Sequence, residues 1–127
     1  MSDFSALGSA LYSKLGGTAG TVYYGLAPQQ TAPPYLIMER SAASDEYWFA
    51  GGHHARAEYV VKAVSNRTWP SQAQDLYQAA HAKIQRQGLS VTGYNALRCE
   101  RTATLEYRDP DGYWHVGGVY RIEVEQI

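Results

Sequence analysis

Two adjacent histidines, His53 and His54, lie in the stretch EYWFAGGHHARAEYVV, residues 46–61, where a metal or catalytic site is conceivable. Adjacent residues of an extended chain point to opposite sides, so the two imidazoles are badly placed to bind one ion. His54 and Glu58 can share a strand face, but four residues span roughly 13 Å. His115 can approach only if the fold brings the last strand alongside. We therefore expect no metal ligands here, and instead polar residues on a loop or strand exit.

Other residue types that carry chemistry lack the necessary patterns. There is no G-x-S-x-G nucleophile motif. Cys99 falls on the apolar face of an expected strand, where a thiol behaves as a small hydrophobic group. The acidic residues of the DPDG stretch, Asp109 and Asp111, are explained by turn geometry. No glycine pair leads into a helix as a phosphate-binding loop requires. The sequence therefore predicts no catalytic residue, no bound cofactor and no enzyme activity.

The bulk composition predicts one soluble domain spanning residues 1–127. The 127 residues are enough for an independent core, and the net charge of -1 gives no basic excess for binding nucleic acid. The single cysteine excludes an internal disulfide and fits a reducing compartment. We expect no signal peptide, no membrane span and synthesis in a cytoplasm.

The apolar periodicity predicts an α+β fold in which two helices cover one face of a mainly antiparallel four-stranded sheet, in the order α-β-β-α-β-β. A long hairpin loop is expected between the first two main strands, and a short extended piece, TVYYG, before the first of them. The expected helices are residues 3–15 and 71–87, and the expected strands are 35–43, 55–65, 96–108 and 113–126.

Alternation along the strands predicts which side chains reach the core. Residues 55, 57, 59, 61 and 63 are apolar, while Arg56, Glu58 and Lys62 share the opposite face. In the strand at residues 96–108, one apolar side is expected to carry Leu97, Cys99, Ala103, Leu105 and Tyr107. This leaves a second sheet face of mixed charge, which either contacts water or meets another subunit.

Residues 41–55 are expected to form a connection much longer than an ordinary hairpin loop. Tyr47, Trp48 and Phe49 form an aromatic cluster within it. We interpret the segment as a projecting hairpin whose aromatic side chains dock on a partner, with the histidines 53 and 54 beside them. The alternative is that the segment folds back onto its own domain.

The order of these segments resembles that of the tail terminator, or tail completion, proteins of long-tailed bacteriophages and related prophages. The resemblance covers nearly the whole chain, and no single motif is diagnostic. It rests on the helix ending at Leu15, the extended VYY of residues 22–24, the LAP and PPY stretches that lead into the first strand, and the later helix and hairpin.

The resemblance implies a structural virion protein with no catalytic residues. Family members form a ring, typically of six subunits, on the head-proximal end of the tail tube, where they stop polymerisation and receive the head-to-tail connector. It thus implies contacts with other copies of the chain, with the tail tube protein and with the connector, while DNA passes through without specific binding. Our hypothesis for the interface adds charged residues to the aromatic segment, namely Arg56, Glu58, Arg108 and Arg121. A small dimeric α+β enzyme, a ligand-binding domain, or another connector or minor capsid component remain alternatives.

Overall fold

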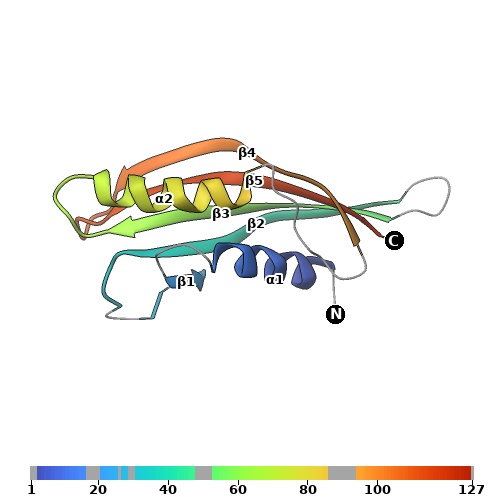
Figure 1. The fold of residues 1–127 in the computed structure, drawn as a ribbon, viewed down its shortest axis with the longest axis horizontal. Helices are drawn as coiled ribbons and strands as arrows, with labels where there is room; N and C mark the ends of the chain where they lie inside the picture. The colour runs from blue at the N-terminus through green and yellow to red at the C-terminus, as the bar shows by residue number, and fades with distance from the viewer. Residues whose placement is uncertain are drawn as a thin grey trace.

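The computed structural model describes residues 3–16, 21–25, 27–28, 31–47, 53–85 and 94–126 of the chain. Two helices lie against a long, twisted five-stranded sheet (Figure 1). The elements are α1 (Asp3–Leu15), β1 (Thr21–Tyr24), β2 (Tyr35–Tyr47), β3 (His53–Ser65), α2 (Ser71–Ile84), β4 (Tyr94–Arg108) and β5 (Trp114–Gln126).

Both helices form where apolar residues recur at helical spacing. In α2 the apolar stripe is buried and consists of Ala73, Leu76, Tyr77, Ala80 and Ile84. In α1, Leu11 and Leu15 are fully buried in the same core cluster. At the start of α2, Pro70 occupies the N-cap position, and no side chain caps the helix. The Gln74 side chain instead donates a hydrogen bond to Glu106 Oε1 on β4, at 2.8 Å.

The sheet has one more strand than expected, and it is mixed. The strand order is β1-β2-β3-β5-β4, and β1 pairs in parallel with β2. The other three pairings are antiparallel, as expected. The four residues of β1 were expected only as an extended piece, because four residues are too short for alternation to identify a strand. The expectation of a four-stranded sheet in the order α-β-β-α-β-β is therefore wrong in this detail.

The expectation of a long loop at residues 41–55 is also wrong in its extent. Strand β2 continues to Tyr47 and β3 begins at His53, so the two strands pair until Tyr47 faces His53. Polar residues such as Ser44, Asp45 and Glu46 have low strand propensity, so the sequence did not indicate that β2 continues through them. In the structure, pairing to a long neighbouring strand outweighs that propensity. The connection itself, residues 48–52, lies outside the described residues.

Two register shifts in β4 change which of its side chains face the helices. They lie between Ala96 and Arg98 and between Arg101 and Ala103. An extra residue in one strand reverses the alternation beyond it. Cys99 is therefore buried in the core, whereas Leu105 and Tyr107 point to the opposite face. The expectation that these residues share one side is wrong, because a strict period of two cannot anticipate a bulge.

Two adjacent glycines in β5 allow close packing, Gly118 against helix α2 and Gly117 against the neighbouring strand β3. A Cβ on Gly118 would lie 2.5 Å from Tyr77 Oη of α2, and one on Gly117 would overlap the Val61 carbonyl oxygen of β3. A side chain is therefore excluded at both positions. Gly117 therefore allows β5 to lie close to β3, and Gly118 allows α2 to pack close to the sheet.

Candidate functional site

The face of the sheet turned away from the helices is the candidate interaction surface, here called the open face. Ala57, Tyr59 and Val61 of β3 are buried against the helices. The alternating residues Arg56, Glu58 and Lys62 point the other way and are partly exposed. No described helix covers this face (Figure 1).

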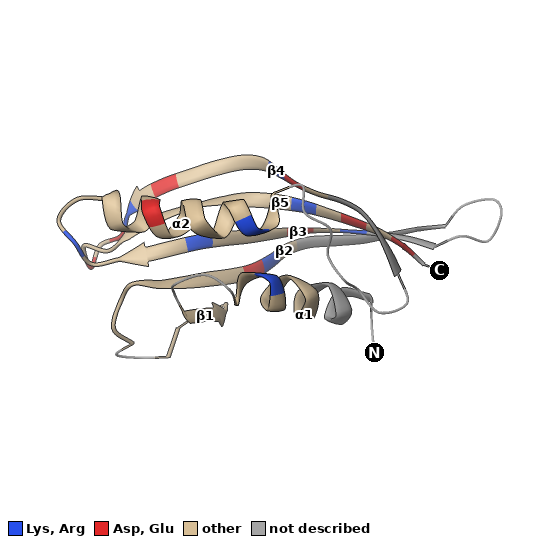
Figure 2. Cartoon of the chain, in the orientation of Figure 1, with Lys and Arg blue, Asp and Glu red and all other residues tan. Residues whose placement is uncertain are grey.

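One end of the open face carries paired charges on β3 and β5. Arg56 Nε lies 3.0 Å from Glu123 Oε1, and Arg121 Nη2 lies 3.7 Å from Glu58 Oε1. Figure 2 shows the two signs interspersed along these strands instead of gathered in blocks. The arginine side chains are more than a third exposed, so each pair contributes at most about 1 kcal/mol to the free energy of unfolding. Such a pattern sets the register of an association more than its strength.

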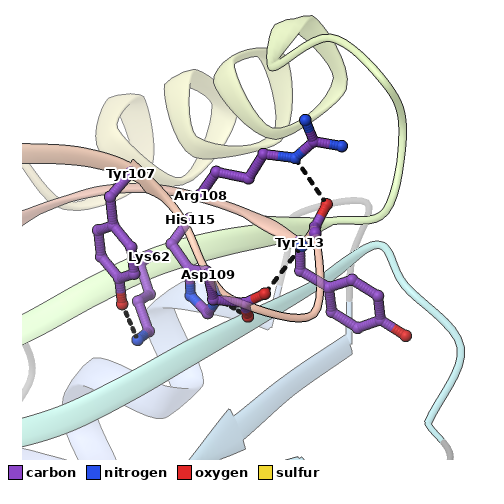
Figure 3. A network of polar contacts seen from close by, with 7 residues as sticks. Lys62, Tyr107, Arg108, Asp109, Tyr113 and His115 are labelled. Carbon is purple, nitrogen blue, oxygen red and sulfur yellow. Dashed lines mark hydrogen bonds and ion pairs between the residues drawn. The ribbon is translucent and has the colours of Figure 1, made fainter.

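The other end of the open face carries a polar aromatic group, here called the outer network, made of Lys62, Tyr107, Asp109, Tyr113 and His115 (Figure 3). Its rings stack, because Tyr107 and His115 lie parallel with centroids 4.7 Å apart. Lys62 Nζ donates a hydrogen bond to Tyr107 Oη at 3.0 Å. Nε2 of His115 lies 2.7 Å from Asp109 Oδ2, and the Tyr113 backbone N–H donates to Asp109 Oδ1.

The hydrogen bond from His115 is the main reason why the pKa of Asp109 lies below its ordinary value of 3.8. Nearby, burial and the closeness of Tyr113 and Asp109 raise the pKa of Tyr35. The ionised Asp109 thus ties the β4–β5 turn to the strand residue His115. The arrangement offers aromatic rings and hydrogen-bonding groups to a partner, and it has no activated nucleophile.

The structure brings together three of the four charged residues expected at an interface. Arg56, Glu58 and Arg121 lie on the open face and form the pairs just described. Arg108 does not join them. It lies at the β4–β5 turn, where its Nε donates to the Gly112 carbonyl at 3.2 Å and its guanidinium lies 5.9 Å from the centre of the Trp114 ring.

The aromatic part of the expected interface is described only at its base. Tyr47 and His53 are the last residue of β2 and the first of β3, and His54 pairs with Glu125 of β5. Their side chains, and the whole of Trp48 and Phe49, lie outside the described residues.

His54 and His115 lie far apart in the structure. The partner of His54 on β5 is Glu125, ten residues beyond His115. Ten strand residues span roughly 33 Å, so His115 cannot join the paired histidines. Among the residues that the structure describes, no three His, Cys, Asp or Glu side chains are grouped closely enough to hold a metal ion.

A buried polar group beneath α2 was not anticipated from the sequence. This inner cluster consists of Tyr77, His81, Arg101 and Tyr120. Tyr120 Oη lies 2.6 Å from both Tyr77 Oη and His81 Nδ1, and Arg101 Nη1 donates to Tyr77 Oη at 3.2 Å. Burial raises the pKa of Tyr120, while burial and the Arg101 charge lower the pKa of His81. The spacing of Tyr77 and His81, one helical turn, was the available signal.

Cys99 is buried, as expected, and burial raises the pKa of its thiol to about 11. It is therefore a packing residue, since the thiolate is the reactive form. Within the described part of the chain, no helix has the length and apolar character to cross a membrane.

Comparison with known proteins identifies the family. The family model described as "Tail completion protein gp17" matches residues 6–125. Among solved structures, a chain from "Virion of native gene transfer agent (GTA) particle" superposes with a TM-score of 0.86 at 17% identity, and the match covers 98% of each chain. A search of functionally characterised proteins gives no significant match. The bacteriophage resemblance seen in the sequence is confirmed, and the chain belongs to the gp17 family of tail completion proteins, which are structural proteins of the virion tail.

Proposed function

We propose that this chain is a single-domain subunit of a ring, most simply a hexamer, at the head-proximal end of the phage tail tube. The ring ends polymerisation of the tube and presents a surface to the head-to-tail connector. The family match over residues 6–125 carries this proposal, and the number six comes from the family resemblance. The partners are other copies of the chain, the tail tube protein and the connector protein.

The open face supports a role in assembly. On it, Tyr107 is 43% exposed and the side chains of Arg56 and Arg121 are more than a third exposed, so a neighbouring subunit can contact aromatic and charged groups there. The near-neutral net charge of -1 is compatible with a ring through which DNA slides.

The test is to polymerise the tail tube protein of the same phage with and without this protein. We expect tubes of reduced length with added density at one end only, visible by negative-stain electron microscopy. Native mass spectrometry of the protein alone then reports the ring size. Unchanged tube length at equimolar protein would contradict the proposal. A discrete dimer at every concentration would favour the enzyme or ligand-binding alternative, and binding to the connector without any effect on tube growth would favour a connector role.

The aromatic segment at residues 47–49 provides a second test of the same function. Replacing Trp48 and Phe49 by serine should leave a folded subunit that no longer caps tubes. Lys83→Ala on the exposed side of α2 is the matched control and should cap normally. Normal capping by the Trp48→Ser, Phe49→Ser protein would show that the segment has no docking role.

A further inference from the structure

Trp69 is the most exposed large hydrophobic residue that the structure describes, with 74% of its surface accessible. It lies in the connection between β3 and α2, residues 66–70, at the left-hand end of Figure 1. Tryptophan is enriched at protein–protein interfaces and among the residues that contribute most to binding. The residues around it are polar and include Asp75 of α2.

The backbone around Trp69 is held in place by hydrogen bonds on both sides. Ser65 Oγ accepts from the Arg67 N–H at 3.2 Å and donates to Gln72 Oε1 at 2.7 Å. The Thr68 carbonyl accepts from Trp114 Nε1 at 3.1 Å. The indole is therefore presented on a fixed loop, which lowers the entropy cost of inserting it into a partner.

A pocket on another part of the molecule has the size and lining to receive an indole. It has a volume of about 470 Å³ and lies between α1 and the strands β1, β2 and β3. Tyr12 and Tyr24, which are 49% and 57% exposed, line it together with Arg40 and the buried Tyr59. Gly8 also lines it, and a Cβ there would lie 3.3 Å from Tyr59 Oη, in tight contact.

We propose that Trp69 of one subunit inserts into this α1 pocket of the next subunit. The tyrosine rings suit edge or offset contacts with an indole, and Arg40 can lie against its face. Arg67 and Asp75 both flank Trp69, and the Asp75 carboxylate is the group that can meet Arg40 at the border of the pocket. An opposite-charge pair across the contact fixes the orientation of the two subunits.

The contact runs between subunits because Trp69 cannot fill the pocket of its own chain. The pocket residue Tyr59 and the loop anchor Ser65 are six residues apart along β3, roughly 20 Å. The loop and the pocket share no lining residue. Two different patches that fit each other make a head-to-tail contact, which closes into a ring when the rotation permits. The inference thus rests on the proposed ring and specifies one of its contacts.

The direct test is disulfide trapping in the intact chain. Ser9→Cys places a thiol at the pocket, and Ser71→Cys places one beside Trp69; both positions are exposed. Oxidation of the double variant should give a ladder of covalent multimers on a denaturing gel. Ser9→Cys with Gln78→Cys, an exposed position elsewhere on α2, is the matched control and should give at least tenfold less product. The buried Cys99 does not compete.

Substitution of the tryptophan distinguishes a specific contact from chance collision. Trp69→Ala in the Ser9→Cys, Ser71→Cys background should reduce the ladder at least tenfold, while Trp69→Phe should retain part of it. Because the side chain is mostly exposed, Trp69→Ala should unfold at the same temperature as the parent. An equal ladder with Trp69→Ala, or no ladder at millimolar protein, would overturn the proposal.

A mixing experiment tests the head-to-tail geometry. Trp69→Ala keeps its pocket but lacks the indole, whereas Ser9→Trp keeps the indole but fills its pocket. Neither variant should form rings alone, and an equimolar mixture should form only heterodimers by native mass spectrometry. If the Trp69→Ala protein assembles into normal rings and caps tubes, the contact is wrong and the proposed function stands. If the parent protein fails to cap tubes, the proposed function is wrong, and the trapping result still decides the contact.

Discussion

Two tyrosine–histidine groups lie on opposite faces of the sheet, and strand β5 contributes Tyr120 to one and His115 to the other. The two groups differ in burial and in their hydrogen-bond partners. In the inner cluster, Tyr120 is fully buried and is bonded to Tyr77 and His81 of α2. In the outer network, His115 stacks on Tyr107, which remains 43% exposed. Tyrosine and histidine thus form a buried cluster on one face of the sheet and a partly exposed network on the other.

This difference suggests separate roles for the two faces of β5, one in the stability of the subunit and the other in association between subunits. A buried hydroxyl that loses its partner costs the full desolvation of the group, whereas an exposed one is satisfied by water. We therefore expect the inner cluster to determine whether the subunit folds. The open face, with its outer network and paired charges, is expected to affect mainly how folded subunits meet.

The largest expected effect comes from the glycine pair between the two groups. Gly117→Ala would force a methyl group against the β3 backbone at Val61, which cannot move without separating the strands. We expect a loss of about 3 kcal/mol in the free energy of unfolding. Gly118→Ala meets the ends of the Tyr77 and Arg101 side chains first, and it should cost less, about 2 kcal/mol. Urea unfolding followed by circular dichroism measures both. Gly118→Ala costing more than Gly117→Ala would contradict this ranking.

The expected difference between the inner cluster and the outer network is tested most directly by removing one hydroxyl from each of them. Tyr120→Phe deprives Tyr77 and His81 of their shared partner, and we expect a loss of about 2 kcal/mol. Tyr107→Phe removes only the exposed bond to Lys62, and should change stability by less than about 0.5 kcal/mol. Both are measured by urea unfolding at neutral pH. Equal costs would mean that the two faces are not energetically distinct.

The sequence predicts the helices and most of the sheet because their signals are periodic. The apolar stripe of α2 and the DPDG turn are confirmed, the latter with Gly112 at a φ of 88°. The bulges of β4 and the parallel β1 are not predictable from period alone, because both depend on which strand lies alongside. For the same reason, period alone does not predict that β2 extends to Tyr47 or that β3 begins at His53.

The candidate site could be predicted only in part. Arg56, Glu58 and Arg121 were named from the sequence for an interface and lie together on the open face, and their role in an interface stays a prediction. The inner cluster was missed because it joins α2 to β4 and β5. The spacing of Tyr77 and His81 places them on one side of α2, but it does not identify their partners on the sheet. Trp69 was missed because a lone aromatic residue between a strand and a helix gives no sign of whether it is buried or exposed.

A smaller effect is expected from the pH dependence of the inner cluster. The pKa of His81 is lower in the folded chain than the ordinary value of 6.5, chiefly because burial disfavours the charged imidazolium. The unfolded chain therefore binds the proton more readily, and protonation destabilises the fold. Stability should be constant above pH 6.5 and fall as the pH drops from there toward the folded pKa. His81→Gln should remove this slope in urea unfolding between pH 7.5 and pH 5.5, and a slope unchanged by the substitution would assign the effect to another group.

The smallest expected effect on folding comes from the charge pairs of the open face. A double-mutant cycle with Arg56→Ala and Glu123→Ala should give a coupling near 0.5 kcal/mol that falls with added salt, because Arg56 is partly exposed. Glu58 and Arg121, whose charged atoms lie 3.7 Å apart, form the matched control and should couple less. A coupling above about 2 kcal/mol, unchanged by salt, would mean that this face is built for stability. In the capping assay, Arg56→Glu should lose activity, and adding Glu123→Arg should restore part of it. Together with a weak coupling in the monomer, this result would show that these charges act in assembly.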